Sequence, residues 1–189
     1  MSRLTDAKFR LPMRAVKVIT LGIFVVLTVL MAGPLNAAEE IKVPFNFQWG
    51  ESLSRLEEGL KGVKATIVER KDVRGRQCLV VEGITQKLLQ RALFYFDNDS
   101  LGEIELHYGD TSWDGASYSN FFDQTRRNIE KKYGIGRVIA RQKTREGDVL
   151  QTLVGYQWSQ PSTTLALYYY TAEKDAQSFR LLSLHYRGY

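Results

Sequence analysis

The chain has 189 residues, of which 44% are hydrophobic and 25% charged, and its formal net charge is +5. Residues 1–37 hold five of the 26 basic residues and one of the 21 acidic residues, which leaves the rest of the chain a net charge of only +1. This composition excludes a disordered, collagen-like or polytopic membrane protein, and the nearly neutral remainder argues against binding to nucleic acid.

Residues 1–37 are predicted to be a secretory signal peptide. Basic residues up to Lys17 precede an apolar run of 15 residues, Val18–Ala32, and small residues follow it. This order of basic, apolar and small residues is typical of signal peptides, and the run is shorter than the roughly 20 residues of a membrane-spanning helix. We expect export to the periplasm or the medium after cleavage behind Ala37 or Ala38, with no membrane span left after cleavage.

Two alternatives stay open for this segment. It could remain attached as an uncleaved anchor, and Met13 could be the true start in place of Met1. The chain has one cysteine, Cys78, far beyond the cleavage site. A lone cysteine at that position excludes lipid attachment at the cleavage site, an internal disulfide and a cysteine-based zinc cluster. We expect Cys78 to be a small buried residue of a strand.

The remaining residues, 38–189, are predicted to form a single α+β domain. Apolar residues alternate over Val43–Trp49, which predicts a strand. A short helix follows, with leucines at helical spacing between Ser52 and Gly62. Four strands are then predicted, at Val63–Arg70, Gln77–Ile84, Leu88–Phe96 and Leu101–Tyr108.

A second helix is predicted after a loop rich in Gly, Asp and Ser, because Phe121, Phe122, Ile129 and Tyr133 share one face. Gly134 ends this helix. Four more strands are predicted, at Arg137–Thr144, Asp148–Trp158, Thr163–Thr171 and Ser178–Arg187.

The two halves of the domain, at about 43–109 and 117–189, resemble each other. Each is a helix followed by four strands, and the halves end in the matching tripeptides Leu106-His107-Tyr108 and Leu184-His185-Tyr186. Internal similarity of this kind indicates a duplicated unit. The predicted fold class is therefore α+β: two tandem α-β-β-β-β units forming a largely antiparallel, curved sheet with both helices on one face.

Several short motifs carry a resemblance to known proteins. They are Phe47-Gln48-Trp49-Gly50 before the first helix, Lys132-Tyr133-Gly134 at the end of the second, and Tyr156-Gln157-Trp158. With the helix-plus-four-strand layout, they resemble a set of uncharacterised bacterial exported α+β proteins similar to β-lactamase inhibitory protein and, more distantly, to the small lipoprotein of the outer-membrane barrel-assembly machine. The resemblance covers most of residues 43–189 and implies binding through a surface, with no particular site residue.

The first candidate site is a site for a divalent metal. Glu103, Glu105 and His107 lie at every second position of a predicted strand, so they share one face with about 6.5–7 Å between neighbours. His185 could add a second imidazole if the two matching strands are neighbours. Carboxylates and imidazoles are ligands for divalent metals, although the same pattern is also typical of the solvated face of a sheet.

The second candidate site is a protein-contact surface. Helices are expected to cover one face of the sheet, which leaves Glu105, His107, Leu181 and His185 on the other face, and Trp113 lies in a polar loop. A basic face of the second helix, with Arg126, Arg127, Lys131 and Lys132, is an alternative surface for anionic partners.

Cofactor and nucleophile motifs are missing from the sequence. It contains neither a phosphate-binding G-x-x-x-x-G-K-[ST] nor a G-x-S-x-G motif. We therefore expect no cofactor and no catalytic residue. The function predicted from the sequence is a monomeric, non-enzymatic binding or envelope-support module for an unknown protein or envelope component, and a metal-dependent enzyme or metal-binding protein is the alternative.

Overall fold

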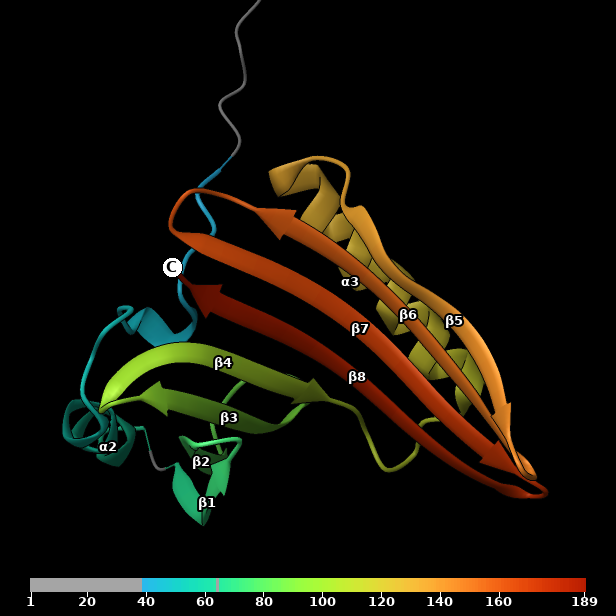
Figure 1. The fold of residues 1–189 in the computed structure, drawn as a ribbon, viewed down its shortest axis with the longest axis horizontal. Helices are drawn as coiled ribbons and strands as arrows, with labels where there is room; N and C mark the ends of the chain where they lie inside the picture. Colours follow the sequence, from blue (N-terminus) through green and yellow to red (C-terminus); the bar gives the residue numbers. More distant parts are fainter. Residues whose placement is uncertain (1–38, 64) are drawn as a thin grey trace, which may run out of the picture. The chain divides into compact units, whose positions relative to one another are not determined.

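The computed structural model describes residues 39–63 and 65–189, so the predicted signal segment lies outside the described residues. One antiparallel sheet of eight strands dominates the fold, in the order β1-β2-β3-β4-β8-β7-β6-β5. The strands are β1 (Thr66–Val73), β2 (Arg76–Glu82), β3 (Leu89–Asp97), β4 (Ser100–Tyr108), β5 (Arg137–Glu146), β6 (Val149–Ser159), β7 (Thr163–Lys174) and β8 (Gln177–Gly188). The sheet is strongly curved (Figure 1).

Tight turns join most neighbouring strands. Asn98 and Asp99 connect β3 to β4 with φ angles of 50° and 63°. Positive φ at both central residues is the conformation of the two-residue hairpin turn that Asn and Asp favour. The strands β4 and β8 are far apart in sequence but pair in the middle of the sheet, where Glu105 lies opposite His185.

Both helices pack on the same face of the sheet. The helix α2 (Leu53–Lys61) begins after Ser52, whose side chain accepts a hydrogen bond from the backbone of Arg55. The helix α3 (Gly115–Tyr133) begins after Asp114 in the same way. Their buried residues join one apolar cluster with the inward side chains of the sheet; the helical members are Leu56, Leu60, Phe122 and Ile129. The predictions of an α+β fold and an antiparallel sheet are confirmed.

The predicted first strand, Val43–Trp49, is wrong. Its residues pair with no strand in the described part of the chain and contain a short 3-10 helix at Pro44–Asn46. Proline cannot donate a ladder hydrogen bond, and Phe45 and Asn46 both have a φ of 61°, which is incompatible with an extended strand.

The alternation nevertheless identified side chains that pack inward. The rings of Phe45 and Phe47 lie 6.2 and 5.8 Å from the ring of Phe94. The indole of Trp49 donates a hydrogen bond to Thr163 at 2.9 Å. It also lies against Gly188, where an added Cβ would come within 2.6 Å of the indole. The N-terminal segment is therefore anchored to both halves of the sheet.

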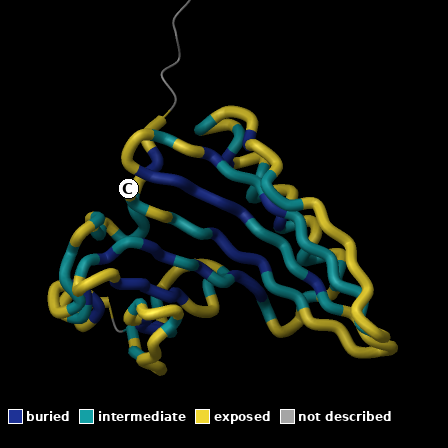
Figure 2. Tube along the Cα trace, in the orientation of Figure 1, coloured by how far each residue is buried: buried dark blue, intermediate teal, exposed yellow. Residues whose placement is uncertain are grey.

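Residues 38–189 form one compact unit. Burial is greatest in the middle of the sheet, and exposed residues gather at the tips of the β5–β6 and β7–β8 hairpins (Figure 2). Of the two helices that the structure describes, neither is long and apolar enough to cross a membrane.

Candidate functional site on the open sheet face

The face of the sheet turned away from α2 and α3 is called the open face below. In β4, Ile104 and Leu106 join the apolar cluster on the helix side. Because successive side chains of a strand point to opposite faces, Glu103, Glu105 and His107 lie on the open face. The pairing of β4 with β8 then places His185 beside Glu105 on this face, as the sequence pattern predicted for neighbouring strands.

Glu103 has three charged or polar partners on the open face. Its Oε2 accepts hydrogen bonds from Arg76 at 2.9 Å and Arg187 at 2.8 Å, and its Oε1 lies 3.6 Å from Nδ1 of His185. Burial by itself would raise the pKa of Glu103, but the hydrogen bonds from His185, Arg187 and Arg76 lower it to about 2. Glu103 is therefore ionised at neutral pH.

Glu105 forms the second centre of the same network. The hydroxyl of Tyr95 donates to its Oε2 at 3.0 Å, and Nε2 of His107 donates to its Oε1 at 2.5 Å. Nε2 of His185 lies 3.6 Å from the same Oε1. Burial would raise the pKa of Glu105, yet the hydrogen bond from His107 and the charges of both imidazoles lower it.

The geometry does not fit the predicted metal site. The four residues Glu103, Glu105, His107 and His185 do come together on the open face. Their carboxylate oxygens, however, are taken up by arginine, tyrosine and histidine donors, and the described residues contain no group of three His, Cys, Asp or Glu side chains arranged to hold a metal ion. In this network the negative charges of Glu103 and Glu105 are instead balanced by hydrogen-bond donors of neighbouring side chains.

The contact of Ser183 with His185, which in turn faces Glu103, was not predicted from the sequence. Ser183 Oγ lies 2.9 Å from Nε2 of His185, whose Nδ1 faces Glu103. Ser183 is only 3% exposed, and the strand β8 that carries it is paired on both sides. A nucleophile needs access to its substrate and free donors for an oxyanion, so this serine is placed as a structural partner of His185. Only the Ser-x-His spacing, combined with the β4–β8 pairing, could have revealed it.

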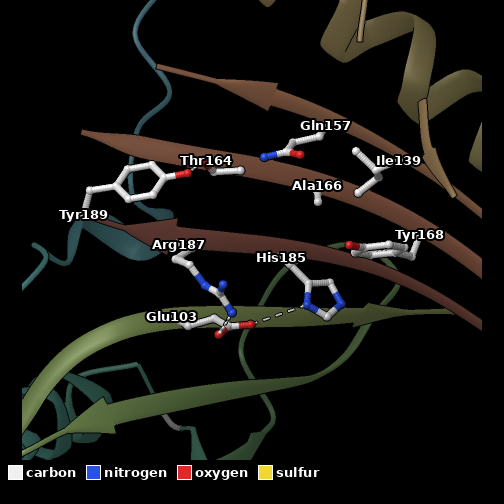
Figure 3. A pocket seen from close by; sticks show the side chains of 9 residues that line it. All are labelled: Glu103, Ile139, Gln157, Thr164, Ala166, Tyr168, His185, Arg187 and Tyr189. Atoms are coloured by element: carbon white, nitrogen blue, oxygen red, sulfur yellow. Dashed lines mark hydrogen bonds and ion pairs between the residues drawn. The ribbon is translucent and has the colours of Figure 1, made fainter. Parts of the chain in front are cut away.

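A shallow groove of about 250 Å³ runs beside the network (Figure 3). Glu103, His185 and Arg187 line one side of it, and Tyr168 lies at one end. The ring of Tyr168 meets His185 edge-on at 5.0 Å. It also lies over Gly155, where an added Cβ would be 2.8 Å from the ring. The groove thus combines charged, imidazole and aromatic groups.

The far end of the open face is apolar. Tyr170 and Phe179 are in contact with a centroid distance of 6.1 Å, and Phe179 is 56% exposed. Leu181, one of the predicted contact residues, lies opposite Tyr170 in the β7–β8 pair. Aromatic side chains are enriched at the centres of protein contacts.

Trp113 lies elsewhere. Its ring packs on Tyr118 at 5.1 Å and on Phe121 at 5.0 Å, both residues of α3. The structure therefore brings Glu105, His107, Leu181 and His185 to one face but leaves Trp113 on the helix side. The polar loop around Trp113 predicted exposure, whereas the loop folds back on the helix that follows it.

A second, smaller apolar cluster lies on the strands β2 and β3 of the open face. It consists of Cys78, Val80, Leu93 and Tyr95, with Arg76 over the ring of Tyr95 at 4.8 Å. The prediction that Cys78 is buried in a strand is confirmed, and burial raises the pKa of its thiol. This cluster fixes Arg76 and Tyr95, the two donors that β2 and β3 supply to the network.

Comparisons of the chain with models of protein families, with curated proteins and with solved structures gave no match. The function is therefore inferred from the residues of the site themselves.

Proposed function

We propose that this protein is an exported, non-enzymatic binding module whose contact surface is the open face of its sheet. The observation that carries the proposal is the composition of that face. A compensated network of charges around Glu103 and Glu105 lies next to an apolar end with the exposed Phe179. Neither of the two described helices contributes side chains to it.

The charge network supports binding better than catalysis. A general acid needs a raised pKa, whereas the pKa of Glu103 is about 2 and that of Glu105 is lowered. Ser183 is buried and lies in a strand that is paired on both sides. Fixed, ionised groups of this kind instead give a partner a rigid electrostatic pattern to match.

The apolar end supplies the contact area. Aromatic side chains lose little conformational freedom on binding and are enriched among residues that dominate protein contacts. Tyr170 and Phe179 support each other, and Leu153 and Leu181 lie on either side of Tyr170. The partner we propose is a protein or an envelope component that places an apolar group here and polar groups at the groove.

The proposal includes export and a duplicated architecture. Export is supported by the signal-like pattern of residues 1–37, and cleavage near Ala37 is checked by mass spectrometry of the native protein. Duplication of an α-β-β-β-β unit is supported by the matching tripeptides and by the strand order. In chain order, β1–β4 and β5–β8 each run from an edge of the sheet inward to the central pair β4 and β8. The resemblance to β-lactamase inhibitory protein and the monomeric state are parts of the same proposal.

The experiment is a paired capture from envelope extract with wild-type protein and four variants. Phe179→Asp and His185→Ala change the open face, whereas Arg127→Glu and Lys131→Glu change the exposed face of α3. We expect the same partner to be lost with the first pair and kept with the second. Loss confined to the α3 variants would overturn the assignment and favour the basic helix surface.

A calorimetric titration tests the metal alternative directly. Because the carboxylate oxygens already have donors, we expect no heat from zinc, nickel or calcium. Saturable binding that Glu105→Gln abolishes would replace the contact proposal with a metal site.

A further inference from the structure

A second cavity lies on the other side of the sheet, against α3. It is a groove of about 550 Å³ between α3 and the connection at residues 86–88 that joins β2 to β3. Its floor is formed by side chains of the central strands β4 and β8. The groove is separate from the open face, and its size is in the range of sites for small ligands.

The floor of this groove is apolar. Tyr108 and Leu184 are each 7% exposed and belong to the main apolar cluster, and Phe121 packs beside them from α3. The hydroxyl of Tyr108 accepts a hydrogen bond from Gln86 at 2.8 Å. Tyr186 also lines the groove. The floor therefore offers apolar and aromatic surface to a ligand.

The rim of the groove is positively charged. Lys87 and Lys132 line it, and none of its lining residues, all within the described part of the chain, is Asp or Glu. Lys132 does face Glu39 at 3.7 Å, but both side chains are more than half exposed, at 57% and 52%. An exposed pair of this kind is weak, so Lys132 can exchange Glu39 for another anion at little cost.

We propose that this groove binds a single-chain amphiphile with an anionic head, such as a fatty acid. The alkyl chain lies on the floor formed by Tyr108, Leu184 and Phe121, and the carboxylate lies between Lys87 and Lys132. Each buried methylene adds apolar contact, and the two ammonium groups select a negative head. The proposal is independent of the open face, which lies on the opposite side of the sheet.

Calorimetric titration of the purified protein with dodecanoate, below its micellar concentration, tests the proposal. We expect one molecule bound per chain, with affinity falling by up to about fourfold for each methylene removed toward octanoate. Monolaurin has the same chain with a neutral head and should bind at least about tenfold more weakly. Equal affinity for the two heads would overturn the role of the lysines.

Variants locate the binding site. Lys87→Glu and Lys132→Glu should each weaken dodecanoate binding about tenfold, whereas Lys131→Glu, next to Lys132 but outside the groove, should not. Glu39→Gln controls for the ion pair that Lys132→Glu also breaks, and it should leave binding unchanged or stronger.

Filling the groove gives a test that does not depend on charge. Thr125 is partly exposed on α3 and lines the groove, so Thr125→Trp places an indole in it. This variant should no longer bind dodecanoate, and its circular dichroism spectrum should show that it is still folded. The site would be overturned if dodecanoate still bound to Thr125→Trp. It would also be overturned if Lys131→Glu weakened binding as much as Lys132→Glu does.

Discussion

The two faces of strand β4 bury their side chains by different means. On the helix side, Ile104 and Leu106 are 0% and 2% exposed among other apolar residues. On the open side, Glu103 is 7% exposed, although it carries a full negative charge. The first face depends on apolar surface removed from water, and the second depends on donors that replace water.

This difference determines what each face can tolerate. An apolar core accepts another apolar residue of similar volume, because contacts are non-directional. A buried carboxylate requires each of its partners in place, since removal of one leaves a charge without compensation. The open face is therefore the chemically specific side of the sheet, and the following predictions test the distinction.

The largest effect is expected on the helix side. Ile104→Ala removes a fully buried side chain and should lower the free energy of unfolding by about 2–5 kcal/mol, because it leaves a cavity. Urea denaturation measures this change. Gln142→Ala on the exposed edge strand β5 is the control and should change little. A small effect of Ile104→Ala would show that the core relaxes into the space.

A smaller loss is expected for the adjacent residue on the other face. Glu103→Gln keeps the shape of the side chain but leaves Arg76 and Arg187 without their carboxylate, and should cost about 1–3 kcal/mol. The same denaturation experiment measures it. If this variant matched wild type in stability, the charge network would contribute nothing to the free energy of unfolding, and the apolar core alone would stabilise the sheet.

The change of the free energy of unfolding at acid pH distinguishes the two faces further. The pKa of Glu103 in the folded protein is about 2, below its ordinary value of 4.5, so its contribution to stability is complete above pH 4.5 and is lost as the pH falls toward 2. Wild type should lose stability over this window, with Glu105 contributing in the same direction. The difference between wild type and Glu103→Gln should shrink as the pH approaches 2, in unfolding curves recorded at several pH values. A difference that stays constant would mean that charge is not its source.

The smallest effect is expected for an ion pair outside both faces. Arg55 and Glu58 on α2 are 3.5 Å apart, and their side chains are 69% and 71% exposed. Arg55→Ala should change stability by less than about 0.5 kcal/mol, because water screens the pair. A loss as large as that of Glu103→Gln would contradict the distinction between buried and exposed charges drawn above.

Local pattern predicted most of the secondary structure. Strand alternation and helix caps gave the eight strands β1–β8 and both helices within a few residues, because the side-chain period and the turn residues are properties of short segments. The strand predicted at Val43–Trp49 failed for a local reason as well, since the positive φ angles of Phe45 and Asn46 leave no trace in apolar alternation.

The candidate site was only half predictable. Glu103, Glu105, His107 and His185 were found because they lie on two matching strands. Their partners Arg76 and Tyr95 come from β2 and β3, and Arg76 reaches Glu103 across 27 residues of sequence. Such contacts depend on the register of several strands at once, which no single segment encodes.

The pairing of β4 with β8 has a consequence for the order in which the molecule is completed. Arg187 meets Glu103 across 84 residues, so β4 keeps an unpaired edge until the last strand arrives. An unpaired edge beside an apolar face can recruit the same strand from another chain. Rapid refolding at high protein concentration should therefore yield dimers that exchange β5–β8, detectable by size exclusion, and dilution during refolding should suppress them. The strand β8, which joins the two halves by pairing with β4 of its own chain, can thus also pair with β4 of a second chain.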